Sequence, residues 1–244
     1  MWIILAAAIV PGILLLYYVY SKDFNPEPKR MIYKGFFYGC LSVLASTLIS
    51  GPLLKLGFFV DHPSTLAEAI KTSFFGAAIP EESAKLLMLW LLLRNSPEFD
   101  ERYDGMVYAA SVGLGFACLE NLMYVVSAGA GWFYVSVTRA LFAVPGHFAF
   151  AIAMGYYFSR NHFDSHKTTE FDRMKVWLVP VLLHGIYDTL AFSSEISPAY
   201  SGLITIALIF FCIRLFKSTR QRIQEEAERN TYEATHNIDD QYDK

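Results

Sequence analysis

The sequence predicts an all-α protein, a polytopic transmembrane helix bundle of about seven spans. Hydrophobic residues make up 54% of the 244 residues and charged residues 18%, whereas soluble domains usually carry roughly 25% charged residues. The mean hydropathy is +0.33. The apolar residues also run in long blocks instead of alternating with polar ones, which indicates that lipid is the surrounding solvent.

Seven apolar blocks are each close to the roughly 20 residues that a helix needs to cross the hydrocarbon layer. They cover residues 2–20, 32–54, 70–93, 105–128, 132–158, 174–192 and 198–216. The first block lacks a basic leading region, so we interpret it as a span and not as a cleaved signal peptide. We therefore expect a transmembrane domain over residues 1–216 and a polar cytoplasmic tail over residues 217–244.

The basic residues predict the orientation of these spans. Lys and Arg gather in the first, third and fifth connections and in the tail, whereas the alternate connections carry only Lys55 and Lys71. Since cytoplasmic connections carry the excess of Lys and Arg, the N-terminus is expected outside and the C-terminus in the cytoplasm. The long apolar blocks make the lipid bilayer a partner, and the net charge of −3 with no basic stripe indicates no nucleic-acid partner.

Ionisable residues inside the spans are functional candidates, because a charge in hydrocarbon is costly. The set consists of Glu81, Glu82, Lys85, Glu120, Arg139, His147, His184 and Asp188. With a rise of about 1.5 Å per residue, groups on four spans fall at neighbouring depths and are expected to meet in one cavity. Pro80 and Pro145 directly precede candidate residues, and broken membrane helices are tolerated where they border a cavity.

The spacing along each helix predicts which side chains share a face. Glu81 and Lys85 are four residues apart and can pair, whereas Glu82 points about 100° away from Glu81. His184 and Asp188 are also four residues apart, so an imidazole and a carboxylate face the same neighbour. Taken alone, Glu81 with Lys85 can be a neutralised structural pair, Glu120 a packing residue hydrogen-bonded to Tyr124 or a neighbouring span, and His147 a hydrogen-bonded core histidine. The joint occurrence of two histidines and four carboxylates at similar depth favours a site.

A carboxylate beside histidines in a confined cavity can activate water for hydrolysis of an amide bond. Zinc is an alternative, held by His147, His184 and Asp188 with water in the fourth position. The HExxH pattern of many zinc proteases is absent from the sequence. We therefore expect no cofactor, with zinc as the open possibility.

At these residues the chain resembles the PrsW family of bacterial intramembrane proteases, which is related to the type II CAAX prenyl endopeptidases. The matching stretches are "PGILLLYYVYSKD" followed by "PEP", "EESAK" (81–85), "YDGMVYAASVGLGFACLENLMY" (103–124), "PGHF" (145–148) and "HGIYD" (184–188). The resemblance extends to about Leu215. It implies a multi-pass protein of the bacterial cytoplasmic membrane.

The resemblance also implies an activity and a substrate. Similar proteins make the site-1 cut in a single-span anti-sigma factor, which leads to release of the sigma factor. Carried over, Glu81 is the general base together with His147, and His184 with Asp188 stabilises the oxyanion. The related prenyl enzymes have Asn more often than Asp at the last position, and their Phe stands closer to the His than Phe142 does here.

The remaining members of the motifs are expected to support this centre. Glu82 and Lys85 lie beside Glu81, and Glu120 with Asn121 matches a PrsW motif to which we assign no chemical role. Arg139 is expected to balance a carboxylate and not to act in catalysis.

Three other functions remain open from the sequence. A CAAX-type or peptide-maturing endopeptidase would use the same chemistry on another substrate. A proton-coupled transporter would also place Glu, His and Lys inside its spans, although the internal repeat typical of many transporters is not visible here. A catalytically idle binding or immunity protein is the third.

Overall fold

The structure is a computed structural model that describes residues 2–242, and within that range every regular element is helical. The elements are α1 (Trp2–Tyr20), α2 (Lys29–Lys55), α3 (Leu66–Lys71), η1 (Thr72–Ala78), α4 (Ile79–Leu93), α5 (Arg102–Ser127), η2 (Gly129–Gly131), α6 (Trp132–Thr138), η3 (Arg139–Ala143), α7 (Val144–Phe163), α8 (Glu170–Ile196) and α9 (Ser201–Tyr242). The segments η1 and η3 are π-helices, and η2 is one turn of 3₁₀ helix. The prediction of an all-α protein is confirmed.

Six helical segments of the described chain are long and apolar enough to cross a membrane: α1, α2, α5, the run from η2 to α7, α8, and α9 as far as Glu233. The predicted span over residues 70–93 is present as α3, η1 and α4 in unbroken succession. It is divided into shorter pieces, and its buried Glu and Lys residues make it less apolar. The chain is therefore a polytopic helical membrane protein, whereas the orientation of its ends stays a prediction.

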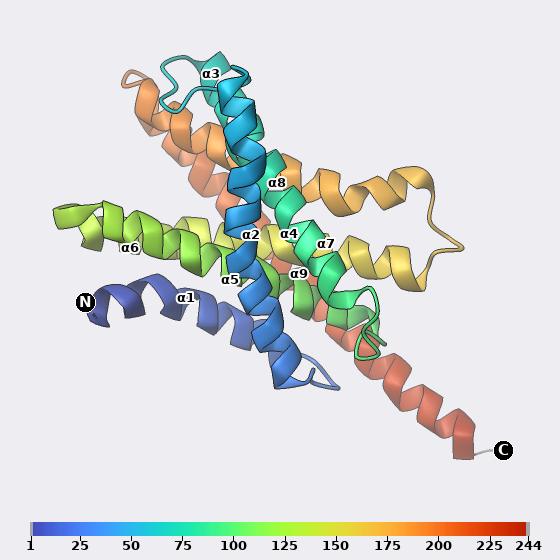
Figure 1. The fold of residues 1–244 in the computed structure, drawn as a ribbon. Helices are drawn as coiled ribbons and strands as arrows, with labels where there is room; N and C mark the ends of the chain where they lie inside the picture. The colour runs from blue at the N-terminus through green and yellow to red at the C-terminus, as the bar shows by residue number, and fades with distance from the viewer. Residues whose placement is uncertain (1, 243–244) are drawn as a thin grey trace.

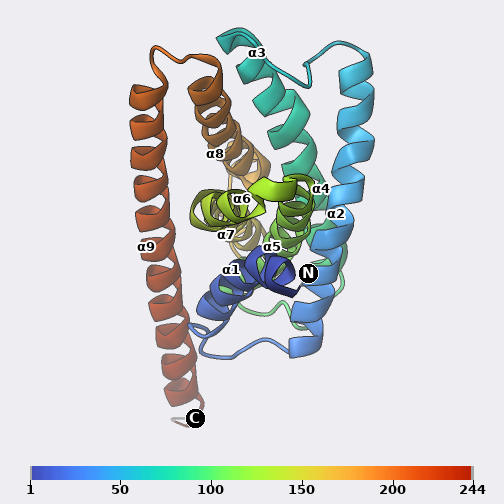
Figure 2. The ribbon, with the colours of Figure 1, turned by 90° about the vertical axis from the view of Figure 1, so that its left-hand side faces the viewer.

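Helix α5 lies at the centre of the bundle. It packs against α1, α2 and α7, and every residue from Tyr103 to Cys118 is buried. In Figure 2, α2 and α9 stand at opposite edges, and α1, α5 and α6 are seen nearly end-on between them. Figure 1 shows the same arrangement from the side, where α1 and α5 run across the view and α2 runs steeply in front. Groups on α5 are thus surrounded by the other helices.

Capping residues fix where α5 and α8 begin. At the start of α5, Glu101 and Asp104 form a capping box, in which Asp104 Oδ2 accepts from the backbone N–H of Glu101 at 2.7 Å. At the start of α8, Thr169 and Asp172 form a second box, and the Asp172 N–H donates to Thr169 Oγ1 at 3.2 Å. Each box satisfies backbone donors that the first helical turn leaves without partners.

The backbones of α2 and α5 touch at two glycines. A Cβ atom on Gly39 would overlap the carbonyl oxygen of Val112, and one on Gly115 would overlap the carbonyl of Phe36. Small residues of this kind allow membrane helices to pack at short range, where lipid tails give no hydrophobic drive for association. The contact therefore depends on the absence of side chains at these positions.

We expect Gly39→Ala to destabilise the protein by about 1–3 kcal/mol, because the added methyl group must push two backbones apart. Gly51→Ala is the matched control on the same helix, since a Cβ atom at Gly51 meets nothing within 4 Å. The measurement is the unfolding midpoint of each purified variant in the same detergent. Equal midpoints for the two variants would contradict the expectation.

Candidate active site

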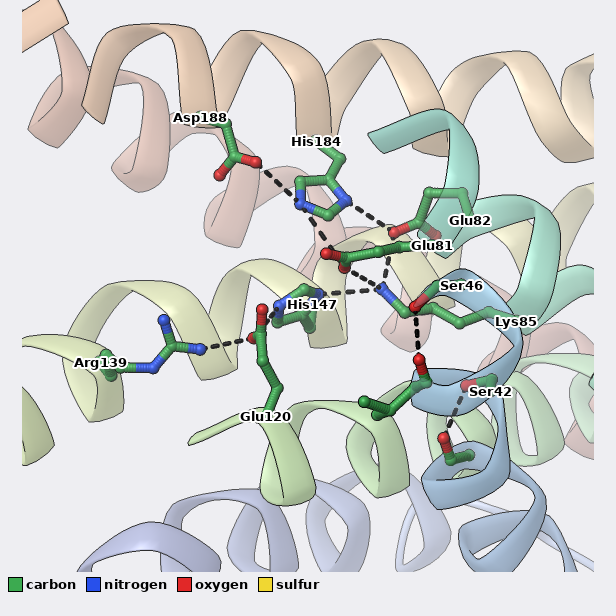
Figure 3. A network of polar contacts seen from close by, with 12 residues as sticks. Ser42, Ser46, Glu81, Glu82, Lys85, Glu120, Arg139, His147, His184 and Asp188 are labelled. Carbon is green, nitrogen blue, oxygen red and sulfur yellow. Dashed lines mark hydrogen bonds and ion pairs between the residues drawn. The ribbon is translucent and has the colours of Figure 1, made fainter. Parts of the chain in front are cut away.

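The predicted site residues form one connected network of hydrogen bonds and ion pairs (Figure 3). They come from α4 (Glu81, Glu82, Lys85), α5 (Glu120, Asn121), η3 (Arg139), α7 (His147) and α8 (His184, Asp188). The expectation that groups from several spans lie close together therefore agrees with the geometry. Their catalytic roles stay predictions.

Lys85 lies at the middle of the network. Its Nζ is 2.8 Å from Glu82 Oε1 and 3.4 Å from Glu81 Oε2, and it donates to His147 Nδ1 at 3.1 Å. The same Nζ lies 3.9 Å from the ring centroid of Phe116, a cation–π contact. Spacing along the helix predicts the pair with Glu81, but the contact with Glu82 is the shorter one. The ammonium group thus balances two carboxylates at once.

His184 bridges the two helices α4 and α8. Its Nδ1 is 2.9 Å from Glu82 Oε1, and its Nε2 is 3.3 Å from Asp188 Oδ2 and 4.0 Å from Glu81 Oε2. Both ring nitrogens therefore face carboxylate oxygens, which can only accept hydrogen bonds. A ring that carries a proton on each nitrogen satisfies both contacts. The ring also stacks on Phe150, with centroids 4.9 Å apart and planes 19° apart.

His147 has a different pair of neighbours. Its Nδ1 faces the Lys85 ammonium, which has no acceptor, so this nitrogen accepts the hydrogen bond. Its Nε2 lies 3.0 Å from Glu120 Oε2 and therefore donates. These contacts assign a neutral ring with its proton on Nε2. His147 thus connects Lys85 to Glu120, and its ring makes no hydrogen bond to Glu81.

Arg139 balances the Glu120 carboxylate. Its guanidinium forms an ion pair with Glu120, donates from Nε to Asn121 Oδ1 at 3.0 Å, and lies 4.0 Å from the ring centroid of Tyr124. Asn121 in turn donates to the carbonyl of Ala8 on α1 at 2.9 Å. This arrangement fits the expectation that Arg139 neutralises a carboxylate, and it links α5, η3 and α1.

The network has a closed side and an open side. The side chains of Glu82, Lys85 and His184 are 0%, 3% and 4% exposed. Those of Glu81 and Asp188 are 13% and 18% exposed. The second pair can therefore meet water or a substrate, whereas the first group cannot without a change in the structure.

Local backbone features position the groups of α4 and α7. The π-helices η1 and η3 directly precede these helices, and Pro80 and Pro145 occupy their first turns. Proline has no N–H to donate to the preceding helical turn, and both prolines stand where a widened π-helical turn already interrupts the regular α-helical hydrogen bonding. On α5, a Cβ atom at Gly113 would meet the side chain of Ala151, so α5 and α7 approach closely beside His147. This close approach allows His147 to reach Glu120.

The donor set of the network fits a metal ion in its chemistry. One ligand atom from each of Glu81, Glu82, His147 and His184 lies within 4.8 Å of the others. Carboxylate oxygens and imidazole nitrogens are the ligands that zinc takes in catalytic sites. Asp188 is outside this group because it faces His184 Nε2. The Lys85 ammonium contacts three of the four donors, so a metal ion bound to them requires Lys85 to withdraw.

Two aromatic residues of the site were not predicted from the sequence, Phe116 under Lys85 and Phe150 against His184. Tyr124, which helical spacing places on one stripe with Glu120, lies beside Arg139. Phe116 stands four residues before Glu120, and Phe150 stands three residues after His147, so both share a helix face with a candidate residue. That spacing is the signal that could have identified them.

The fold and this site define a multi-pass membrane protein whose buried Glu and His groups are suited to hydrolysis. Residues 27–215 match the family model described as PrsW family intramembrane metalloprotease. The chain belongs to this family. It is therefore a membrane peptidase, located in the bacterial cytoplasmic membrane, and the transporter and idle-protein interpretations are not supported.

Curated relatives agree with the family over most of their length. The chain is 33% identical to "Protease PrsW" of Geobacillus kaustophilus, over 93% of this chain and 96% of the relative. It is 34% identical to "Protease PrsW" of Bacillus subtilis, over 90% and 97%, and 34% identical to that of Clostridioides difficile, over 86% and 87%. No solved structure matches the chain.

Proposed function

We propose that this protein cuts a single-span membrane protein at a site-1 position and that an anti-sigma factor is its substrate, so that cleavage leads to release of the sigma factor. Membership in a family described as intramembrane metalloproteases supports the reaction class, hydrolysis of a peptide bond, and keeps a metal ion as the alternative to the metal-free reaction. The position of Glu81 inside the helical bundle supports a scissile bond within or beside the bilayer. The motifs shared with PrsW proteins are the support for the substrate class.

We assign the general base to Glu81 and not to Glu82 because the two adjacent glutamates differ in exposure. Glu81 is partly exposed, and its carboxylate makes only a 3.4 Å contact to Lys85 and a 4.0 Å contact to His184. Glu82 is fully buried and is held at 2.8 Å by Lys85 and at 2.9 Å by His184. A general base must reach both water and the proton that it removes. Glu81 meets this requirement and Glu82 does not.

In the proposed reaction, Glu81 removes a proton from a water molecule as the water oxygen adds to the scissile carbonyl carbon. The carbonyl oxygen becomes the oxyanion of a tetrahedral intermediate. Entry of the substrate opens the structure at His184, and its Nε2–H turns from Asp188 to donate a hydrogen bond to this oxygen, while Nδ1–H stays with Glu82. The C–N bond then breaks, and the proton held by Glu81 passes to the leaving amine.

The other residues of the network orient these groups. Lys85 and Glu82 fix each other at 2.8 Å and hold His184 against the water site. Glu120 and Arg139 orient His147, which supports the Lys85 ammonium beside Glu81. We infer that His147 acts on Glu81 through Lys85 and not by direct contact.

Zinc is the alternative means of activating the water. Glu81, His147 and His184 would hold the ion, which would polarise the carbonyl and acidify the water. In that case the Lys85 ammonium would move away from Glu81 and His147 and would remain paired with Glu82, which would not bind the ion. In the metal-free reaction that we propose, Lys85 itself provides the positive charge at the centre.

The test of the function is cleavage of a defined substrate by purified full-length protein in proteoliposomes. The substrate is a tagged single-span anti-sigma factor from the same genome, and a prenylated CAAX peptide is assayed in parallel. We expect a discrete fragment of the anti-sigma factor, whose new terminus mass spectrometry locates at or near the span. Cleavage of the CAAX peptide alone would overturn the proposed substrate class.

A chelator arm of the same assay tests the metal. We expect less than a twofold change in rate after dialysis against EDTA and after a stronger zinc chelator, because Lys85 supplies the central charge. Loss of activity that zinc restores would show instead that Glu81, His147 and His184 hold the ion. Zinc content measured on the same samples separates incomplete removal from true metal independence.

A further inference from the structure

Two of the stretches that resemble the PrsW family take no part in the proposed reaction, and they meet at one end of the bundle. "PEP" (26–28) lies in the connection between α1 and α2, and "YDG" (103–105) begins α5. With Asp23 they contribute an acidic cluster, which consists of Asp23, Glu27 and Asp104. One carboxylate oxygen from each of the three residues lies within 4.8 Å of the others.

The acidic cluster is buried and its charge is not balanced by the protein. Asp23, Glu27 and Asp104 are 8%, 5% and 1% exposed. Over residues 2–242, no Lys or Arg forms a salt bridge with any of them. The nearby basic residues Arg30 and Arg102 pair elsewhere, with Glu98 and Asp164. Buried carboxylates without a positive partner are costly, so a bound group that neutralises them would stabilise the fold.

Two carboxylates of the cluster are each fixed through one oxygen and have the other oxygen free. Asp23 Oδ1 accepts from the Asn25 N–H at 3.2 Å, and Asp104 Oδ2 accepts from the N–H groups of Asp100 and Glu101. Asp23 Oδ2 and Asp104 Oδ1 are buried and have no hydrogen-bond partner. Since the backbone holds one oxygen of each carboxylate in place, the second oxygen of each remains available as a ligand.

We propose that Asp23, Glu27 and Asp104 bind a hard divalent cation, Ca²⁺ or Mg²⁺, with water completing its coordination. Two oxygens bound to one Ca²⁺ at about 2.3–2.6 Å can stand at most about 5 Å apart, and one oxygen from each residue of the cluster lies within this limit of the others. Mg²⁺ binds oxygens at about 2.0–2.1 Å, so its ligand oxygens stand at most about 4.2 Å apart and it needs the tighter arrangement.

The cation would join the first connection to the central helix. Three tyrosines already hold this corner: Tyr20 donates to the carbonyl of Glu27 at 3.1 Å, Tyr103 to that of Val19 at 2.9 Å, and Tyr108 to the Glu27 carboxylate. Asp104 and Glu120 lie on the same helix, about 24 Å apart along its axis at about 1.5 Å per residue. The cation site is therefore separate from the candidate active site.

Protons are the competing occupants of the same oxygens. Burial raises the pKa of Asp23 to about 7, and the charge of Asp104 raises it further. Burial also raises the pKa of Glu27 to about 7. A cluster that shared only protons would need no metal, and it would not bind a lanthanide probe at neutral pH. Direct measurement of cation binding distinguishes the two cases.

The experiment uses purified full-length protein in detergent, stripped of metal and titrated with Tb³⁺ at neutral pH. Tb³⁺ prefers the same oxygen ligands as Ca²⁺, and it emits light when a tyrosine close to it is excited. Tyr108, which donates a hydrogen bond to the Glu27 carboxylate, is such a tyrosine. We expect saturable emission that Ca²⁺ or Mg²⁺ displaces, and the two displacement curves show which ion the site prefers. Asp23→Asn should weaken Tb³⁺ binding at least tenfold.

Two control variants locate the binding. Asp100→Asn removes an exposed neighbouring charge but keeps the backbone N–H that holds Asp104, so it should bind Tb³⁺ like wild type. Glu81→Gln should also keep the emission, because the active site is distant. Equal emission from wild type and Asp23→Asn, or wild-type emission that neither Ca²⁺ nor Mg²⁺ displaces, would overturn the proposal.

The melting temperature of each protein shows whether a variant loses Tb³⁺ binding because it is misfolded. Without metal, Asp23→Asn removes one of three like charges, so its melting temperature should be no lower than that of wild type. With Ca²⁺ or Mg²⁺, wild type should gain the larger increase. If Asp23→Asn melts well below wild type, Glu27→Gln replaces it, and the same loss of Tb³⁺ binding is expected because Gln removes the charge at equal size.

Discussion

Glu81→Gln is expected to lower the cleavage rate of the tagged substrate by roughly 10²–10⁴-fold, the usual contribution of a general base. Gln keeps the size of the side chain but cannot take a proton from water. The measurement is the initial rate of fragment formation in proteoliposomes. Because Glu81 makes only long contacts to Lys85 and His184, we expect the melting temperature to remain within a few degrees of wild type.

Two matched variants sharpen this prediction. Glu195→Gln changes an exposed glutamate at the end of α8 and should leave the rate unchanged. Glu82→Gln should lower both the rate and the melting temperature, because Glu82 holds Lys85 and His184 in the closed side of the network. Full activity of Glu81→Gln would remove Glu81 from the mechanism. A loss of stability equal to that of Glu82→Gln would assign Glu81 a structural role instead.

Lys85→Met is expected to destabilise the protein by about 3–5 kcal/mol, the cost of removing one partner from a buried ion pair. The substitution leaves Glu82 fully buried with His184 as its remaining partner, and it removes the donor to His147. Met has a similar length and fits a hydrophobic surrounding. The measurement is the free energy of unfolding in mixed micelles, together with the amount of protein inserted in the membrane.

The double variant Lys85→Met with Glu82→Gln separates charge from packing. It removes both charges of the 2.8 Å pair, so we expect it to recover part of the lost stability. It should stay inactive, because Lys85 no longer lies beside Glu81. A single Lys85→Met variant as stable as wild type would contradict the central role of the ammonium group.

The members of the site could be predicted from the sequence because the rule that identifies them is physical. A charge inside a membrane span needs a partner, so Glu81, Lys85, His147 and His184 stand out against their apolar neighbours. The helical fold follows from the same contrast between long apolar blocks and charged connections. These inferences need only the composition of each block and its length.

The contacts between helices could not be predicted in the same way. Residue spacing gives the neighbours on one helix, but not the rotation of one helix against another. The resemblance paired Glu81 with His147, and a His147 nitrogen does lie within 4.8 Å of a Glu81 oxygen, but the hydrogen bonds of His147 go to Lys85 and Glu120. The sequence also suggested Asp188 as a zinc ligand, whereas its carboxylate contacts His184 and lies outside the group of four donors.

The acidic cluster was missed for another reason. Asp23 and Glu27 lie in a connection, and Asp104 lies in the first turn of α5, where carboxylates are ordinary helix-capping residues. Nothing in their positions along the chain indicates that they are buried. Only the packing of the first connection against α5 brings them together.

The two π-helices have a consequence for how this chain can change in length. A π-helix is an α-helix widened by an extra residue, and η1 and η3 stand directly before the helices that carry Glu81 and His147. Loss of a single residue there would restore an ordinary α-helix and leave the following residues nearly in register, whereas loss of a residue from an α-helical stretch would turn all that follows by about 100°. Single-residue deletions should therefore be tolerated better at residues 72–78 and 139–143 than within α5, α7 or α8.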